Sequence, residues 1–526
     1  MDKEKALIVI THDNGTSGTK TCLISVSDKI EILASKMTEH GVIYPEGIPH
    51  AAEQDPKEWW RAVCEGTKAV LAQSNIKPDQ IEGISFSTQT QCALFVDKEG
   101  NPLDNPYIWI DGRAVKEFEV LRDGLIKVAG YDVFKMLQFV KVTGGGPGSA
   151  KDQMWKYQWF KKNKPELYKK VYKMLDVKDY LVFRCTGKML CSKDTAHILW
   201  LYDTRPGKME WHEGICKRYG INIDHLPEVK DSTDIAGELL PEPAKEMGLN
   251  PGTPVIMGGT DSSCIPVGSG AVQLNDTHIY VGTSGWIITI ADKRITNLED
   301  YEGGVLGAIP GTYNYIGIME TCGACLAWAK DHLADLEVAQ AEEKGISPFV
   351  LLDDMASQSP PGANGLIFTP WLYGNRAPRE DTRVRGSFFN LSIQNGRRDM
   401  FRSILEGVAL HMRWMREGFD KKNVPITEPV RFVGGGANSS VWCQIIADVL
   451  GVKIQPVKYT QDGGAIGAGL IAAVGLGKTN FDEGKALVPV GKIYEPNLEN
   501  KDIYDKIYKV FKKIYKKNKS LYHKLN

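Results

Sequence analysis

The same tetrapeptide, Gly-Thr-Ser-Gly, occurs twice in the chain, and each copy lies between two short apolar runs. The first copy spans residues 15–18, after ALIVI (6–10) and before TCLISV (21–26). The second spans residues 282–285 within THIYVGTSGWIITIADK (277–293). Apolar runs around a glycine-containing turn predict strand–turn–strand units. Two such units, each near the start of one half, indicate a duplicated domain.

The length of the chain supports two domains as well. A single hydrophobic core stops growing at about 250–300 residues, and this chain has 526, of which 42% are hydrophobic and 25% charged. Strand-like runs such as IEGISFS alternate with segments of helical spacing such as MWKYQWFKKNKPELYKKVYKML (154–175). We therefore predict a mixed α/β protein with a first lobe of residues 1–272 and a second of residues 273–526.

Charge and hydropathy exclude several classes of partner. Lys and Arg number 64 against 65 for Asp and Glu, so no net field favours nucleic acid or an anionic membrane. No apolar stretch approaches the roughly 20 residues of a membrane helix, and the N-terminus lacks the pattern of a signal peptide. The ten cysteines show no disulfide framework. We expect a soluble cytoplasmic protein with neither nucleic acid nor a membrane as partner.

The two repeated turns are suited to a chain of phosphates, because both are rich in backbone N–H and hydroxyl groups. The candidate phosphate-binding residues are Gly15, Thr16, Ser17, Thr19 and Lys20 in the first turn and Gly282, Thr283 and Ser284 in the second. Lys20 could also be an ordinary solvated lysine at a strand end. The duplication thus points towards a nucleotide.

A third glycine-rich segment, FVGGGANSSVWCQIIADVLG (432–451), joins an apolar strand end to an amphipathic helix. Glycines let a ring or phosphate approach the backbone, and a helix N-terminus adds partial positive charge. The predicted nucleotide contacts are Gly435, Gly436, Ala437 and Ser440, with a plain tight turn as the alternative.

Other glycine-rich segments fit a nucleotide site less well. GKT (477–479) is no P-loop, because Ala472 stands where that motif needs its first glycine. Gly464, Gly467 and Gly469 are expected to let a helix pack closely on its neighbours. GGGPGS (144–149) is interpreted as a connection or lid loop.

Eight motifs occur in an order that resembles the FGGY carbohydrate kinases. They are D-N-G-T-S-G-T-K (13–20), W-I-D-G-R (109–113), K-Y-Q-W (156–159), G-G-T-D (258–261), G-T-S-G (282–285), R-G (385–386), E-G-V-A (406–409) and the block 434–448. The resemblance implies the two-lobed fold of actin, hexokinase and the heat-shock ATPases, with duplicated ribonuclease-H-like domains around a cleft. Residues 179–197, 226–239 and 248–261 resemble the xylulokinase branch in order and spacing.

The resemblance implies an enzyme that phosphorylates a sugar hydroxyl with ATP and Mg²⁺, D-xylulose to D-xylulose 5-phosphate being the first expectation. Xylulokinases usually read Gln-Met-His-Gly where this chain reads Gln-Thr-Gln-Cys at 89–92. Ribulose, erythritol, gluconate and glycerol therefore stay open as substrates. A non-catalytic sugar- and ATP-binding homologue is a further alternative, against which the presence of both Asp13 and Asp261 argues. Homodimers are frequent among such kinases, so a homodimer is also expected.

By resemblance, Asp261 is the catalytic base that accepts the proton of the attacking hydroxyl, although by itself it could be a helix cap. Asp13 is expected to hold Mg²⁺ through water, and Gly323 to lie beside the adenine. The candidate sugar-binding residues are Thr90, Gln91, Trp109, Asp111 and Arg113. Asp111 and Arg113 could equally form a structural ion pair, and Trp109 and Trp159 could be core residues. His12 is interpreted as a neutral imidazole packed under the first turn.

Overall fold

The first half of the chain is built on a mixed sheet. The computed structural model describes residues 6–128 and 130–526. In the first sheet β1 pairs antiparallel with β2 and parallel with β4, and β2 continues antiparallel to β3. β14 and β15 both lie parallel to β4, and β13 is antiparallel to β14. The strands are β1 (Leu7–Asn14), β2 (Gly18–Val26), β3 (Ile30–Glu39), β4 (Gly83–Thr88), β13 (Ile235–Glu238), β14 (Pro254–Ile256) and β15 (Gly259–Thr260).

The second half repeats this topology. β16 pairs antiparallel with β17 and parallel with β23, as β1 does with β2 and β4. β17 continues antiparallel to β20, and β24 lies parallel to β23. The strands are β16 (Asp276–Val281), β17 (Gly285–Ala291), β18 (Thr296–Asn297), β19 (Glu302–Leu306), β20 (Tyr313–Met319), β23 (Thr427–Val433) and β24 (Ile454–Pro456). The shared path of the two sheets agrees with the duplication predicted from the repeated turns.

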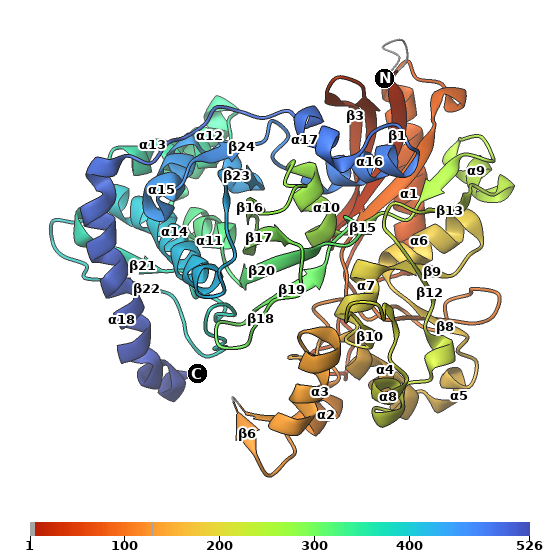
Figure 1. Cartoon of the computed structure of the whole chain (residues 1–526). Coiled ribbons are helices and arrows are strands. Elements are labelled where there is room, and N and C mark those ends of the chain that lie inside the picture. Colours follow the sequence, from red (N-terminus) through yellow and green to blue (C-terminus); the bar gives the residue numbers. More distant parts are fainter. Residues whose placement is uncertain (1–5, 129) are drawn as a thin grey trace.

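Helices flank both sheets, and further helices and short strands of the first half form a group below its sheet (Figure 1). The first half carries α1 (Pro56–Gln73), α2 (Val115–Phe118), α3 (Val133–Thr143), α4 (Gln153–Asn163), α5 (Pro165–Tyr168), α6 (Val177–Thr186), α7 (Lys193–Ile198), α8 (Glu213–Arg218), α9 (Pro241–Met247) and α10 (Asp261–Gly268). Its short strands are β5 (Leu94–Val96), β6 (Lys127–Val128), β7 (Tyr131–Asp132), β8 (Lys173–Leu175), β9 (Leu190–Ser192), β10 (Tyr202–Asp203), β11 (Glu210–Trp211) and β12 (Glu228–Lys230).

The second half carries a long C-terminal helix among its own helices. They are α11 (Gly323–Leu333), α12 (Asp335–Lys344), α13 (Pro348–Ser357), α14 (Arg397–Lys421), α15 (Ser440–Leu450), α16 (Gly463–Gly475), α17 (Phe481–Leu487) and α18 (Lys501–Leu525), with β21 (Ile367–Thr369) and β22 (Ser387–Phe389). α18 docks through one apolar stripe that includes Ile507 and Ile514, against the core around Trp371 and Trp414. No helix within the described ranges is long and apolar enough to cross a membrane.

α10 and α16 join the two halves. α16 comes from the second half of the sequence, yet it packs on α10 and on β1, β2 and β4 of the first sheet. A Cβ added at Gly467 would lie 1.9 Å from the carbonyl oxygen of Cys264, so only glycine permits this approach. The prediction that Gly467 serves close helix packing is therefore confirmed. The same hydrophobic core contains Val9 and Ile24 from the first half and Ile466 and Leu470 from the second.

The halves also meet at a second place. Arg294, just after β17, donates to the carbonyl oxygens of Val142 and Lys141 at 2.7 and 2.9 Å and to Thr204 Oγ1 at 2.9 Å. Thr296 Oγ1 donates to the carbonyl of Gly144 at 2.6 Å. The GGGPGS segment thus begins at a contact between the halves; its role as a lid stays a prediction.

Candidate active site

The carboxyl ends of three parallel strands bring the predicted catalytic residues together. In β1, Asp13 lies opposite Ser87 of β4 and the next residue lies opposite Thr88. In β15, Thr260 also lies opposite Thr88, and Asp261 follows it directly. The segment with Thr90 and Gln91 leaves the end of β4 between them. Ligands of such sheets bind outside the carboxyl ends of the strands, so this edge is the candidate active site.

Asp13 is hydrogen-bonded to a neighbouring strand and lies against the start of a helix. Ser87 Oγ donates to Asp13 Oδ1 at 2.7 Å. Burial raises the pKa of the Asp13 carboxyl, an effect that the bond from Ser87 and the charge of Lys20 partly offset. A Cβ at Gly464, near the start of α16, would lie 2.6 Å from Asp13 Oδ2. The N-terminus of α16 therefore lies directly against this carboxylate.

Asp261 is the first residue of α10, and Thr260 occupies the N-cap position before it. The Asp261 carboxylate accepts a bond from the backbone N–H of its own neighbour, Ser262, at 2.6 Å. Thr260 makes no side-chain cap bond, so Asp261 is the residue whose side chain accepts an N–H of the first turn, as its helix-cap alternative predicts; its role as a base stays a prediction. Burial and then the charges of Asp13 and Asp194 raise the pKa of Asp261 to about 7. A carboxyl with such a pKa can take up a proton near neutral pH.

A cavity of about 290 Å³ opens beside Asp13, between the two halves. It is lined by Lys20 from the first hairpin, Thr283 from the second and Gly435 from the glycine-rich segment, so three segments predicted from sequence meet there. The other lining residues are Asp13, Ile265, Tyr280, Gly282, Val433, Gly434, Thr460, Gln461, Gly463 and Gly464. Of these, Tyr280, Thr460 and the start of α16 were not predicted as site residues.

In each repeated turn the first glycine donates its N–H within the turn, to the fourth residue in the first copy and to the third residue in the second. Gly15 N–H donates to the Gly18 carbonyl at 2.9 Å, and Gly282 N–H donates to the Ser284 carbonyl at 3.0 Å. These two N–H groups close their turns, so phosphates would have to be bound by the residues that follow each first glycine. Thr19 Oγ1 is buried and accepts from Asn14 Nδ2 at 2.8 Å, which makes it a support of the turn.

Lys20 and Gly323 contact protein groups at the cavity. Lys20 Nζ forms an ion pair with Asp462 at 2.8 Å and donates to the Gln461 carbonyl at 3.0 Å. Gly323 N–H donates to the Gly282 carbonyl at 2.7 Å, and a Cβ on Gly323 would lie 2.5 Å from that oxygen. Gly323 therefore packs closely against the second turn, and its position beside the adenine stays a prediction.

The glycine-rich segment after β23 divides into exposed and buried residues. Gly434, with a φ of 92°, and Gly435 line the cavity. Gly436 is buried beneath them, where a Cβ would lie 2.5 Å from Val281 Cγ1, and Ala437 is buried as well. Ser440 is exposed as the first residue of α15. Gly435 and Ser440 are thus the more accessible of the predicted nucleotide contacts.

Asp111 and Arg113 form the structural ion pair that was one of their two interpretations. Arg113 Nε donates to Asp111 Oδ2 at 2.8 Å, and Arg113 Nη2 donates to Glu53 Oε1 at 2.7 Å, all among buried side chains. The guanidinium stacks over Tyr107 and Trp159, which fits the core alternative for Trp159. These contacts show the ion pair, and a contact of Asp111 or Arg113 with the sugar stays a prediction.

Trp109 remains accessible: it is 40% exposed, and its Nε1 donates to Thr16 Oγ1 of the first turn at 2.8 Å. The Trp109 side chain is therefore only partly buried, whereas Trp159 packs against the core. His12, by contrast, is buried, lies 5.4 Å from the Phe86 ring and contacts Thr21 Oγ1 at 3.0 Å. Burial lowers the pKa of His12 to about 3, so the imidazole is neutral, as predicted.

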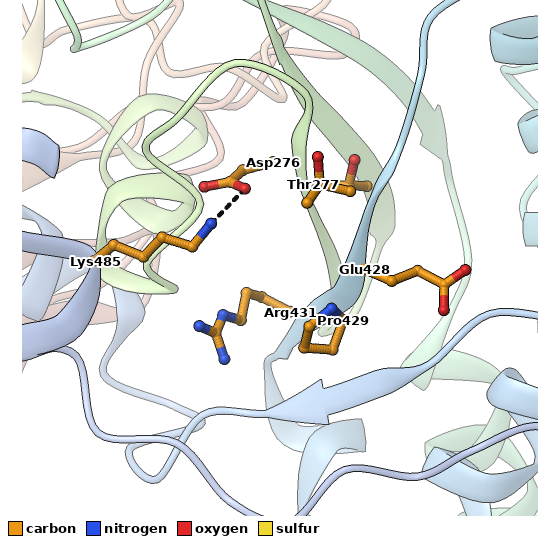
Figure 2. A pocket seen from close by; sticks show the side chains of 7 residues that line it. Asp276, Thr277, Glu428, Pro429, Arg431 and Lys485 are labelled. Atoms are coloured by element: carbon orange, nitrogen blue, oxygen red, sulfur yellow. Dashed lines mark hydrogen bonds and ion pairs between the residues drawn. The ribbon is translucent and has the colours of Figure 1, made fainter.

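A second, smaller pocket lies away from this edge, between β16, β23 and α17. Figure 2 shows Lys485 reaching Asp276, an ion pair of 2.6 Å, with Arg431 on the opposite wall. Its volume of about 20 Å³ has room for roughly one water molecule. This pocket is too small for a nucleotide or a sugar.

Comparisons with known proteins agree with the geometry. The FGGY family of carbohydrate kinases matches twice, by its N-terminal domain over residues 8–268 and by its C-terminal domain over residues 278–476. A xylulose kinase of Staphylococcus epidermidis is 30% identical over 511 residues, 96% of each chain.

Solved structures show the same fold. A gluconate kinase from Lactobacillus acidophilus has a TM-score of 0.86 at 24% identity, over 99% of this chain and 100% of its own. A xylulose kinase from Rhodospirillum rubrum has a TM-score of 0.84 at 25% identity, over 98% and 100%. The two-lobed α/β fold predicted from the sequence is thereby confirmed.

Proposed function

This chain belongs to the FGGY family of carbohydrate kinases, and we propose that it transfers the γ-phosphate of ATP to D-xylulose, giving D-xylulose 5-phosphate. The relatives from Staphylococcus epidermidis and Rhodospirillum rubrum that are named xylulose kinase support this substrate. The gluconate kinase from Lactobacillus acidophilus has a comparable fold. The overall fold therefore does not choose between these two sugars, and the choice depends on the residues that contact the sugar.

The observation that carries the proposal is that Asp261 lies at the same strand edge as Asp13, which lines the cavity. We propose that the Asp261 carboxylate accepts the proton of the attacking sugar hydroxyl. The proton passes to Asp261 as the hydroxyl oxygen bonds to the γ-phosphorus and the bond from that phosphorus to the bridging oxygen breaks, which releases ADP. A late proton transfer of this kind needs a well-placed base more than a strong one.

Asp13 fits the proposed role in holding Mg²⁺ with water. Burial raises the pKa of the Asp13 carboxyl because its negative charge is poorly solvated there, and Lys20, the nearby cation, is already paired with Asp462. A bound cation would compensate the charge of Asp13. No group of three or more His, Cys, Asp or Glu side chains in residues 6–128 and 130–526 is arranged to hold a metal ion. Magnesium in phosphoryl-transfer sites commonly binds through one or two carboxylates, waters and the phosphates themselves. When bound, it would neutralise charge on the transferring phosphoryl group.

We propose that backbone groups hold the phosphates and the adenine. The N–H of Thr283 and the N-terminus of α16 beside Asp13 lie at the cavity, and the N–H groups that follow Gly15 are proposed as further donors. A helix N-terminus carries partial positive charge, which favours a phosphate there. Gly435 and Ser440, at the start of α15, are proposed for the nucleoside.

The proposed setting is the cytoplasm, where ATP is available. All ten cysteines lie in the described part of the chain as free, buried thiols, which fits a reducing compartment. The proposed partners are MgATP and the sugar; a homodimer, and the lobe boundary at residue 272, stay predictions.

The test is ADP release from MgATP against D-xylulose, D-ribulose, erythritol, D-gluconate and glycerol, with wild type and Asp261→Asn. We expect a large rise with D-xylulose that falls by about 10³-fold or more in the variant, since a general base contributes about 10²–10⁴-fold and Asn cannot take the proton. A rise with another compound moves the substrate but keeps the mechanism. If the variant retained the wild-type rate, Asp261 would not be the base.

A further inference from the structure

Two buried acids lie behind the residues predicted to contact the sugar. Gln91 Nε2 donates to Asp152 Oδ1 at 3.1 Å, and Thr90 Oγ1 donates to Asp176 Oδ2 at 3.1 Å. Asp152 is only 5% exposed and Asp176 only 3%, whereas Thr90 and Gln91 are partly accessible. A ligand at Thr90 or Gln91 would therefore meet the acids only through these two side chains.

Asp152 is the point where several groups converge. Its Oδ1 also accepts from Trp200 Nε1 at 3.1 Å, and its Oδ2 accepts from the Ser149 N–H at 2.8 Å. Gln91 and Trp200 both have left-handed backbones, with φ of 59° and 62°. Such conformations cost free energy outside glycine and cluster at functional sites. Lys156 Nζ, which donates to the Gln91 carbonyl at 2.8 Å, fixes the same loop from behind.

The direction of these bonds is dictated by chemistry. Trp200 Nε1 and the Ser149 N–H can only donate, so both oxygens of Asp152 act as acceptors. The Gln91 NH₂ group donates to the same carboxyl group, and Gln91 Oε1 is the atom left for a ligand. Thr90 has one O–H group, and that group is directed at Asp176. Thr90 Oγ1 can therefore offer a ligand only its lone pairs. Both residues thus present acceptors, which match the hydroxyl donors of a sugar but not a carboxylate, which itself only accepts.

We propose that Asp152 and Asp176 make this end of the cleft a hydrogen-bond acceptor that selects a neutral polyhydroxy substrate over one with a carboxylate. The inference rests on the proposed function and deepens it. Asp152 is in this role a positioning residue, because it acts through Gln91 and Trp200.

One group opposes this selection. Arg376, on the segment between β21 and β22, is exposed, and its charge reaches Asp152 from the second half, as that of Lys156 does from behind. A carboxylate on a substrate could pair with Arg376. Comparing a neutral substrate with a carboxylate therefore tests which group determines specificity.

The experiment measures kcat/KM for D-xylulose and D-gluconate in wild type and Asp152→Asn. In the variant, the amide oxygen is still needed by the Ser149 N–H, so the amide NH₂ faces Gln91 and Trp200. Gln91 must then turn its oxygen inward and its NH₂ towards the substrate. We expect the ratio of kcat/KM for D-xylulose to that for D-gluconate to fall at least about tenfold, mainly through a higher KM for D-xylulose.

Asp132→Asn is the matched control. Asp132 is also buried, lies in the same half and caps α3 by accepting from the Lys135 N–H at 2.8 Å. We expect it to leave the substrate ratio unchanged. Thermal melting of all variants checks their folding. If Asp152→Asn does not fold, Gln91→Met replaces it: this change keeps the length of the side chain but removes its acceptor, so the ratio should fall as well.

Three further outcomes would overturn the inference. An equal loss for both substrates in Asp152→Asn would overturn the inference and leave the kinase assignment standing. A wild type that prefers D-gluconate would do the same and would point to Arg376. A wild type that phosphorylates no compound of the panel would overturn the proposed function, and the inference with it.

Discussion

At the scale of single residues, the charges around Asp261 decide how it can work. Burial raises its pKa most, and the charges of Asp13 and Asp194 raise it further. Asp194 is itself buried and accepts from the Thr260 N–H at 2.8 Å, which holds it next to the start of α10. The carboxylates at this strand edge therefore make Asp261 a better proton acceptor than an isolated aspartate would be.

The pH dependence of the reaction follows from this. With both substrates well below their KM, kcat/KM reports the free enzyme, and Asp261 must be ionised to act as a base. We expect kcat/KM to rise with pH through an apparent pKa of about 7 and then to level off. Asp194→Asn removes one negative charge, so its rise should occur at lower pH. A flat profile from about pH 5 to 9 would contradict a base with a raised pKa.

Sequence motifs identified the residues of the site that lie in recognisable turns, such as Asp13, Asp261 and the two Gly-Thr-Ser-Gly repeats. Others could not be found this way. Asp152 is 61 residues from Gln91 in sequence, and no local pattern links them. Asp111 and Arg113 lie in a motif, but whether they face a ligand or each other depends on Glu53 and on burial, which the sequence does not reveal.

At the scale of elements, α16 has two tasks that its glycines divide between them. Gly467 lets the helix pack on α10, as predicted from the glycine spacing. Gly464 has the different task of letting the helix start approach the Asp13 carboxylate. The sequence predicted the close packing but could not reveal the neighbour, because β1 and α16 are about 450 residues apart in the chain.

Substitution of Gly464 by alanine should separate function from stability. The new Cβ would lie within 2.7 Å of both oxygens of the Asp13 carboxylate, which must move. A shift of about 1 Å in a catalytic group can cost about 10²-fold in rate, so we expect kcat to fall by about that factor. Alanine also has the better helix propensity, by about 1 kcal/mol, which offsets the cost of the new contact with Asp13. The melting temperature should therefore change little.

Gly469→Ala is the matched control in the same helix. Its Cβ would lie 3.0 and 3.4 Å from two methyl groups of Ile24 and 3.6 Å from Thr11 Cγ2, and these side chains can adjust. We expect nearly full activity. A Gly464→Ala enzyme that is as active as this control would show that the approach of α16 to Asp13 is not needed for turnover.

At the scale of the whole molecule, the duplication does not produce two independent units. The two sheets repeat one topology, and the two family domains match residues 8–268 and 278–476. Yet α16, at residues 463–475, covers the first sheet. The sequence repeats could be recognised locally, whereas this crossing of the chain is a tertiary feature that no local pattern encodes.

The first half should therefore fail to fold without the second. α16 buries Ile466, Leu470 and Ile471, together with several alanines, in the core shared with β1 and β2. Burial of each such large aliphatic side chain is worth about 1.5–3 kcal/mol, so losing the helix would remove roughly 5–9 kcal/mol. That is comparable to the whole stability of a typical domain, about 5–15 kcal/mol.

We expect a fragment of residues 1–272 to bind a hydrophobic dye and to melt without a cooperative transition, whereas the full chain melts cooperatively. Adding residues 273–526 as a separate fragment should restore part of the cooperative transition, because α16 could then dock on the first sheet. The full chain with Gly469→Ala serves as a reference for a helix that still packs. A cooperative melt of residues 1–272 alone would mean that the first sheet is stable without α16 and that the boundary at residue 272 separates two autonomous domains.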